Sequence, residues 1–128
     1  MPPTQIRFFR NARGAPVRDW LLTLRQDDRR LYAKCVARIR LLAQLGFELR
    51  RPMADYLEED IYELRIRHGR VNHRILYFFH GQNVAILAHA FVKEGAVPRT
   101  DLMRAIQWKE ALLADPEKHT HNEDIPDA

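Results

Sequence analysis

The sequence predicts a small α+β domain with an antiparallel sheet of about four strands, an N-terminal helical hairpin packed on one face and a C-terminal helix. Three observations predict this class. The chain opens with a short apolar segment, continues with apolar residues at helical spacing, and then changes to β-rich runs separated by glycines. The predicted order is β-α-α-β-β-β-α, with the helices against one face of the sheet.

The first half of the chain predicts one strand and two antiparallel helices. Residues 4–9 are typical of a strand, and Pro16 suits the first turn of the helix that follows. Asp27 can cap a second helix, in which apolar residues recur at three- and four-residue steps until Gly46 ends it. Cys35 lies among these apolar residues and is expected in the core. The other face of the second helix is basic and carries Arg29, Arg30, Lys34, Arg38 and Arg40.

The second half predicts three strands and a helix after a loop over residues 47–60. The β-rich runs are 61–68, 71–79 and 83–91, and the glycines between them suit two-residue turns. A last helix is expected from Pro98 to about Leu113. We take residues 1–114 as the domain and 115–128 as a polar, acidic, flexible tail. The tail is interpreted either as a solvated end or as an acidic mimic that shields the basic face.

Composition favours a polyanionic partner. The chain has 21 Lys and Arg against 17 Asp and Glu, and most of the basic residues are Arg. The planar fork of Arg binds phosphate, so nucleic acid is the leading partner, although a GC-rich genome would also enrich Arg. No apolar run is long enough to span a bilayer, and the N-terminus lacks a secretory signal. A cytoplasmic location without a membrane partner is therefore expected.

The turn at Gly69-Arg70 sets the register of the first two predicted β runs. With this turn, Leu64 faces Ile75 on an apolar side that should meet the helices. On the other side Arg65 faces Arg74, which places two like charges directly opposite each other.

The turn predicted at Gly81-Gln82 extends this pattern to a third strand. Arg74 would then face His89, so that one row across the sheet contains Arg65, Arg74 and His89. Lys93 continues the same face just beyond the strand.

This row has the residue types that RNA transesterification needs. A phosphate bound between Arg65 and Arg74 would remove the repulsion between the two arginines. Their guanidinium groups would in turn stabilise the negative charge that develops on the phosphate during cleavage. His89 could accept the proton of a ribose 2′-OH or donate one to the leaving 5′-oxygen. Two alternatives stay open: Arg65 could pair with Glu63 or another acid, and His89 could be a hydrogen-bonded spectator.

Neither a cofactor nor a metal site is predicted. The proposed chemistry requires no metal. His119 and His121 have a spacing that can bind a metal, but the tail offers no third ligand.

Three ordered segments carry a resemblance to a known family. They are residues 57–67 (LEEDIYELRIR), 73–79 (HRILYFF) and 87–93 (LAHAFVK), followed by Pro98 and Ala105 in the closing helix. Together they resemble the RelE/HigB-like toxin superfamily, and most closely its phage-derived branch. The resemblance covers about residues 4–112.

The resemblance implies a fold similar to that of a small microbial ribonuclease and the activity of a type II toxin. Such toxins are metal-independent endoribonucleases that cleave mRNA at the ribosomal A site and inhibit translation. The implied partners are mRNA, the ribosome and an antitoxin, often a helix-turn-helix protein from the adjacent gene. DNA would be contacted only through the antitoxin complex.

The family's functional positions can be carried over residue by residue. By resemblance, Arg65 and Arg67 match strand positions that grip the RNA backbone, and Arg74 matches the arginine at the scissile phosphate. Lys93 falls near the basic residue after the last strand, and His89 matches a histidine of unassigned role. The catalytic candidates are Arg65, Arg74, His89 and Lys93, and the RNA-binding candidates are Arg67, Arg70 and Arg99.

The sequence also departs from the family pattern. Glu94 replaces the second lysine of the usual pair, and Ala90 replaces a glycine. The family's catalytic group on its last helix has no secure match, and Asp101 and Trp108 are the candidates here. Glu94 is expected to weaken phosphate contact and to put full activity in doubt.

Two competing functions stay open, and these departures favour the first of them. The chain could be a non-catalytic module of the same fold that binds RNA, the ribosome or a host protein, as a prophage remnant. A DNA-binding regulator is disfavoured, because the basic face lies on a predicted sheet and no helix-turn-helix pattern is evident.

Overall fold

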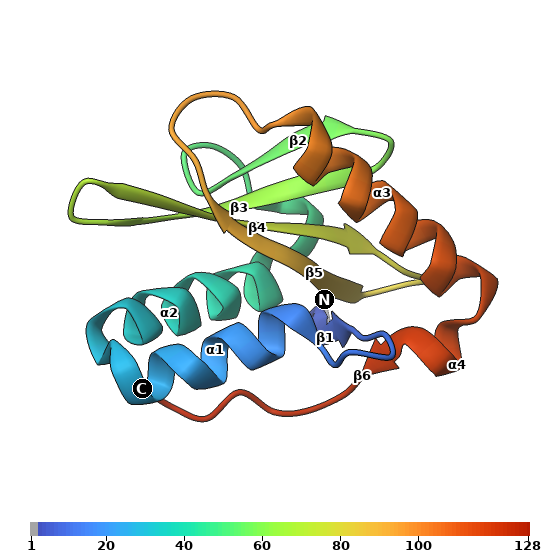
Figure 1. Cartoon of the computed structure of the whole chain (residues 1–128), viewed down its shortest axis with the longest axis horizontal. Coiled ribbons are helices and arrows are strands. Elements are labelled where there is room, and N and C mark those ends of the chain that lie inside the picture. The colour runs from blue at the N-terminus through green and yellow to red at the C-terminus, as the bar shows by residue number, and fades with distance from the viewer. Residues whose placement is uncertain (1–2) are drawn as a thin grey trace.

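A six-stranded sheet runs through the molecule, and helices lie on both of its faces (Figure 1). The structure is a computed structural model that describes residues 3–128. The strands are β1 (Gln5–Phe9), β2 (Ala54–Glu58), β3 (Ile61–His68), β4 (Val71–Phe79), β5 (Val84–Val92) and β6 (Thr120–His121). The helices are α1 (Pro16–Asp27), α2 (Arg29–Leu45), α3 (Arg99–Ala114) and the short α4 (Pro116–His119).

The order of strands across the sheet is β2-β3-β4-β5-β1-β6, and it corrects two predictions. Six strands replace the expected four, because β2 forms inside the predicted loop 47–60 and β6 forms in the tail. The sheet is not purely antiparallel, since β1 pairs with β5 in parallel, from Gln5 opposite Val84 to Phe8 opposite Leu87. The chain between these two parallel strands passes through the α1–α2 hairpin and then β2, β3 and β4, so β1 lies beside a strand that is distant in the sequence.

The predicted helical hairpin is confirmed, with one change at its turn. Asp28, not Asp27, caps α2, because the carboxylate of Asp28 accepts the N–H of Leu31 at 3.2 Å. Gly46 ends α2 with a φ of 54°, a conformation that favours glycine. Over residues 3–128, no helix is both long enough and apolar enough to cross a membrane.

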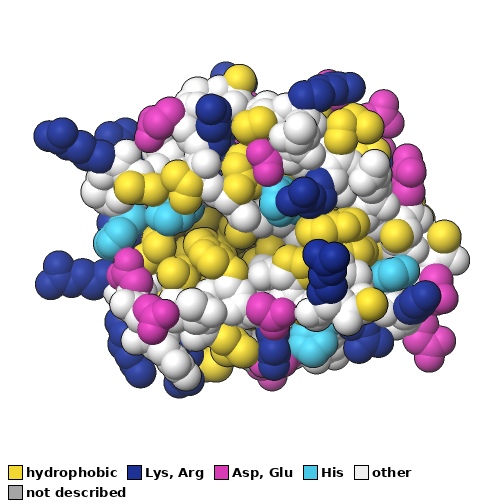
Figure 2. All heavy atoms as spheres, viewed as in Figure 1, with side chains coloured by type: hydrophobic (Ala, Val, Ile, Leu, Met, Phe, Trp, Pro, Cys, Tyr) yellow, Lys and Arg dark blue, Asp and Glu magenta, His cyan; other side chains and the backbone are white. Residues whose placement is uncertain are grey.

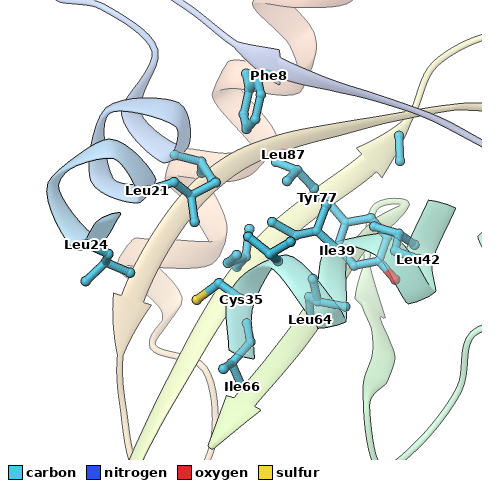
Figure 3. Close-up of a cluster of buried hydrophobic side chains, with 14 of the residues drawn as sticks. Phe8, Leu21, Leu24, Cys35, Ile39, Leu42, Leu64, Ile66, Tyr77 and Leu87 are labelled. Carbon is cyan, nitrogen blue, oxygen red and sulfur yellow. The ribbon is translucent and has the colours of Figure 1, made fainter. Parts of the chain in front are cut away.

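The main hydrophobic core lies between this hairpin and one face of the sheet. Figure 3 shows side chains of α1 and α2, including Leu21, Cys35 and Ile39, meeting strand residues such as Leu64 and Tyr77. Cys35 is buried as predicted, and burial raises the pKa of its thiol to about 12. The side chains on this face of the sheet are therefore buried and contribute to the stability of the fold.

The opposite face is covered in part by α3, which corrects the prediction that all helices lie on one face. Leu102, Ala105 and Ile106 of α3 pack with Leu76 and Phe78 of β4 in a second hydrophobic cluster. Figure 1 shows α3 crossing the sheet on the side away from α1 and α2. The part of this face near the β3–β4 turn carries polar residues and no helix.

The acidic tail is folded against the domain, contrary to the expectation of a flexible segment. The Tyr32 hydroxyl donates to the carbonyl of Pro126 at 2.5 Å, and Arg18 pairs with Glu123 at 3.0 Å. Ile125 packs against the main core. The tail thus lies along α1, α2 and β1, as Figure 1 shows, and does not shield the sheet face that carries Arg65.

The register between β3 and β4 agrees with the prediction. Arg65 faces Arg74, and Leu64 faces Ile75 on the side of the helical hairpin.

The predicted register between β4 and β5 is wrong by two residues. His89 faces Leu76, and Arg74 faces Phe91. The loop is one residue longer than expected, since the N–H of His80 bonds to the carbonyl of Val84. The second residue of the shift is an extra residue within β5. It lies opposite the point between Leu76 and Tyr77 of β4, where the pairing changes register.

Candidate functional site

The candidate site is the part of the polar sheet face where β3, β4 and β5 lie side by side. One row across these strands contains Arg65, Arg74 and Phe91. His89 stands in the neighbouring row, opposite Leu76. His89 nevertheless points to the same face as Arg74. The longer loop and the inserted residue in β5 each shift the pairing by one residue, and two such shifts leave the alternation of side chains between the two faces unchanged. The structure thus brings three of the predicted catalytic residues to one face.

Glu63 joins the two arginines at the centre of this face. Its carboxylate has no exposed surface and accepts Nε of Arg65 at 2.6 Å and Nη1 of Arg74 at 2.9 Å. The two guanidinium groups therefore converge on a carboxylate from the same protein. This is the alternative that the sequence left open for Arg65, and it accounts for the tolerated pairing of like charges.

The ion pairs continue outward from Glu63 toward the edge of the sheet. Nη2 of Arg65 lies 3.5 Å from Asp55 of β2, and Asp55 also binds Arg51 at 2.8 Å. The hydrogen bond from Arg51 lowers the pKa of the Asp55 carboxyl below its ordinary value. With Arg74 at its inner end, this chain of five groups has three positive members and two negative ones, so it keeps a positive charge.

The two arginines differ in what they offer to a ligand. The Arg65 side chain is 37% exposed, whereas that of Arg74 is 11% exposed. Arg74 also donates from Nη2 to the carbonyl of Gly95, and its Nε is buried without a partner. Arg65 can therefore contact a phosphate directly, while Arg74 contributes a fixed, nearly buried charge.

His89 forms the second centre of the site with Asp101 of α3. Nε2 of His89 lies 2.7 Å from Oδ1 of Asp101, and both side chains are mostly buried. The ring of His89 stacks on Phe91 with centroids 5.2 Å apart and meets the ring of Trp108 edge-on at 5.7 Å. Asp101 fixes one imidazole nitrogen, which leaves Nδ1 as the nitrogen that can exchange a proton.

The exposed basic residues of the site lie toward the β3–β4 turn. Arg67 and Arg70 are exposed, and Lys93 lies next to Asn72, whose carbonyl accepts the Lys93 N–H at 3.2 Å. Figure 1 places this turn at the left end of the molecule, and Figure 2, in the same view, shows basic side chains projecting around that end. Acidic and basic groups are mixed elsewhere on the visible face. Glu94 accepts Nδ2 of Asn72 at 3.0 Å, so a negative charge does stand beside Lys93.

Two basic residues of α2 also reach this region, which the sequence did not indicate. Nη1 of Arg38 donates to the carbonyl of Arg65 at 2.7 Å, and Nζ of Lys34 donates to that of Arg67 at 3.4 Å. The basic face of α2 was visible in the sequence. Its position beside β3 was not, because this contact depends on how the hairpin packs.

Arg99, predicted to bind RNA, lies apart from the other candidates. Its guanidinium pairs with Glu58 at the end of the edge strand β2.

The tail histidines each have a partner within the protein. Nδ1 of His119 lies 2.9 Å from the carbonyl of Arg10, and Nε2 of His121 lies 2.9 Å from Glu123. In the part of the chain that the structure describes, no three His, Cys, Asp or Glu side chains are grouped to hold a metal ion.

Comparison with protein families identifies the chain as a relative of phage proteins. Residues 19–110, most of the domain, match the model of the phage-derived Gp49-like proteins (DUF891). The chain belongs to this Gp49-like family. The family is associated with toxin–antitoxin modules. The match includes β2 to β5 and most of α3, and therefore all the candidate site residues. No curated protein matches the chain.

Proposed function

We propose that this Gp49-like protein is the toxin of a type II toxin–antitoxin pair and acts as an endoribonuclease on mRNA. The observation that carries the proposal is one sheet face on which Arg65, Arg74 and the His89–Asp101 pair come together. Membership of the Gp49-like family, which is associated with toxin–antitoxin modules, supports the toxin part of the proposal. The proposed place of action is the ribosomal A site, as in the RelE/HigB-like toxins that the sequence resembles.

The geometry suits cleavage by the ribose 2′-hydroxyl. In this mechanism the 2′-oxygen attacks the adjacent phosphorus and the bond to the 5′-oxygen breaks, which gives a 2′,3′-cyclic phosphate and a 5′-hydroxyl. Nδ1 of His89 would accept the 2′-OH proton, and Asp101 would stabilise the imidazolium that forms. The same proton can then pass to the leaving 5′-oxygen.

Arg65 would stabilise the charge that develops on the phosphorane. Arg65 has the exposure and a guanidinium nitrogen, Nη1, that can donate to a phosphate oxygen. Arg74 is a positioning residue in this scheme, because it is held by the carbonyl of Gly95 and binds Glu63, the carboxylate that orients Arg65. Arg67, Arg70 and Lys93 would guide the flanking backbone through exposed positive charge.

A growth and RNA-mapping experiment tests the proposal. Expression of the chain in bacterial cells should arrest growth and produce specific 5′ ends in cellular mRNA, mapped by primer extension. His89→Gln should lower cleavage by roughly 10²–10⁴-fold. Arg65→Gln should lower it by roughly 10²–10³-fold. His80→Gln, in the β4–β5 loop, is the matched control. Folded variants at both His89 and Arg65 that cleave as well as the wild type would contradict the proposal.

A non-catalytic binding module is the second candidate, and one observation favours it. Arg65 and Arg74 are already engaged by Glu63, so a phosphate must compete with a buried carboxylate for them. In that case expression would arrest growth through binding to RNA or the ribosome, and no new mRNA ends would appear.

The proposed antitoxin has a separate test. The gene beside this one should encode a helix-turn-helix protein that restores growth on co-expression. The isolated toxin should not bind its promoter DNA, whereas the complex should. Specific promoter binding by the chain alone would instead favour a DNA-binding regulator.

A further inference from the structure

A cleft between the β1–α1 loop and α3 lies beside the His89–Asp101 pair and has no role in the function proposed above. Its volume is about 540 Å³, within the range of roughly 300–1,000 Å³ that is usual for small-ligand sites. It is lined by Asn11, Arg13, Gly14, Pro16, Asp19, Arg104 and Trp108.

The charges around this cleft favour an anion. Arg13 and Arg104 are exposed, and among residues 3–128 neither guanidinium has an acidic partner. The one carboxylate in the lining, Asp19, is engaged on both oxygens, since it accepts the N–H of Ala15 at 3.2 Å and pairs with Arg18 at 2.9 Å. The two arginines are therefore available to bind a phosphate.

Trp108 gives the cleft an aromatic wall that is held firmly. One face of its ring stacks on Phe9, with centroids 4.8 Å apart and planes inclined by 11°. Phe9 is itself stacked on His119 at 5.5 Å. An aromatic ring fixed next to unpaired arginines is the combination that proteins use for single-stranded nucleic acids, where bases stack and phosphates pair with guanidinium groups.

The cleft is joined to the candidate catalytic pair through one side of α3. Asp101, Arg104 and Trp108 follow one another at steps of three and four residues, so they lie along the same side of the helix. Asp101 binds His89, and Trp108 touches His89 while it also lines the cleft. An RNA strand with its reacting ribose at His89 would reach the cleft with a neighbouring nucleotide.

We propose that this cleft binds the nucleotide next to the cleaved bond of a single-stranded RNA, with the base against Trp108 and a phosphate between Arg13 and Arg104. This inference rests on the proposed function and assigns a nucleotide subsite to it. It places the RNA across the polar sheet face and over α3, toward the N-terminus of α1.

The test uses the full chain and a short single-stranded RNA in which 2′-O-methyl groups block cleavage. The paired variant Arg13→Gln/Arg104→Gln should lower affinity at least about tenfold and make binding less sensitive to salt. The control variant Arg29→Gln/Arg30→Gln removes the same charge from exposed positions of α2 and should change affinity much less. Equal losses in the two variants would overturn the subsite, because general charge alone would then explain binding.

Trp108 supplies a second readout that does not depend on catalysis. The chain has two tryptophans, so Trp20→Phe leaves Trp108 as the only one. Stacking of a base should quench the emission of Trp108 as the RNA is added, and the paired arginine variant should shift this titration to higher RNA concentration. Unchanged emission at saturating RNA would overturn the proposal.

These results separate the subsite from the proposed enzyme. Binding that depends on the cleft, together with cleavage that does not need His89, would remove the catalytic scheme and support the subsite. Cleavage that needs His89, together with wild-type binding and cleavage by the paired arginine variant, would remove the subsite alone.

Discussion

Glu63 and Leu64 are neighbours on β3, and neither has any exposed surface, yet they belong to two different layers of the protein. Leu64 points to the helical hairpin and lies in a continuous apolar core. Glu63 points to the other face and holds Arg65 and Arg74. One face of the sheet is therefore stabilised by apolar burial, and the other by a network of charges within the same strands.

The difference indicates which face is available for function. Apolar packing stabilises a sheet at little cost, whereas buried ion pairs lose much of their attraction to desolvation and contribute weakly to net stability. A sequence that needed only a stable domain could fill the second face with apolar residues, as α3 does over Leu76 and Phe78. The charges beside that cluster are paired through Glu63, but the exposed guanidinium of Arg65 leaves this face, and not the apolar one, open to the anionic ligand proposed above.

The largest expected effect comes from removing the charge of Glu63. Glu63→Gln leaves Arg74 nearly buried without a counter-charge, so the free energy of unfolding should fall by about 3–5 kcal/mol. Urea denaturation of the two proteins measures this loss. A second change, Arg74→Met in the Glu63→Gln background, should recover part of it by removing the unpaired charge. A loss below about 1 kcal/mol would show that the charges on this face are hydrated and not buried.

A smaller effect is expected for the neighbouring apolar residue. Leu64→Ala removes a fully buried side chain from the hairpin face and should lower the free energy of unfolding by about 3 kcal/mol. Because Leu64 does not reach the polar face, RNA binding measured well below the unfolding temperature should stay at the wild-type level. Loss of RNA binding by a folded Leu64→Ala protein would mean that the two faces are coupled.

The sequence predicted local features of this architecture well. The pairing of β3 with β4 follows from a two-residue turn in which Gly69 has a φ of 62°, and this turn alone set Arg65 opposite Arg74. The helical hairpin likewise follows from apolar spacing and from Gly46 at the end of α2. Information of this kind is contained within a few neighbouring residues.

Features that depend on distant parts of the chain could not be predicted. The parallel pairing of β1 with β5 and the position of α3 on the second face are long-range arrangements with no local signal. The position of α3 also decides that Asp101 binds His89. The sequence therefore offered Asp101 only as a candidate and did not predict its pairing with His89. The inserted residue in β5 has no evident marker either, and it changed the partner of His89.

Deletion of the tail tests how much the C-terminal residues packed on the hairpin side contribute to the stability of the domain. Removal of residues 122–128 eliminates the packing of Ile125 against the core, the Tyr32–Pro126 hydrogen bond and the Arg18–Glu123 ion pair. The free energy of unfolding should fall by about 1–2 kcal/mol, mostly from apolar burial, because the partly exposed ion pair contributes little. Thermal unfolding measures the change. RNA binding should be retained, and its loss would place the tail in the RNA site.

The smallest expected effect is on the pH dependence of stability, and it distinguishes a histidine on each face of the sheet. His89 is paired with Asp101 on the polar face, whereas His73 lies toward the hairpin, packed on Trp20 with its Nδ1 buried and unpartnered. Burial is the main cause that lowers the pKa of His73 below its ordinary value of 6.5, and the neighbouring His68 lowers it further against the opposing charge of Asp28.

A lowered pKa means that the unfolded chain takes up this proton more readily than the folded protein. Stability should therefore begin to fall as the pH drops through about 6.5, and the loss is complete below the folded pKa. His73→Gln should reduce the difference between urea midpoints measured near neutral pH and near pH 5, and His80→Gln is the matched control. If the two variants show the same pH dependence, proton uptake at His73 is not what destabilises the hairpin face in acid.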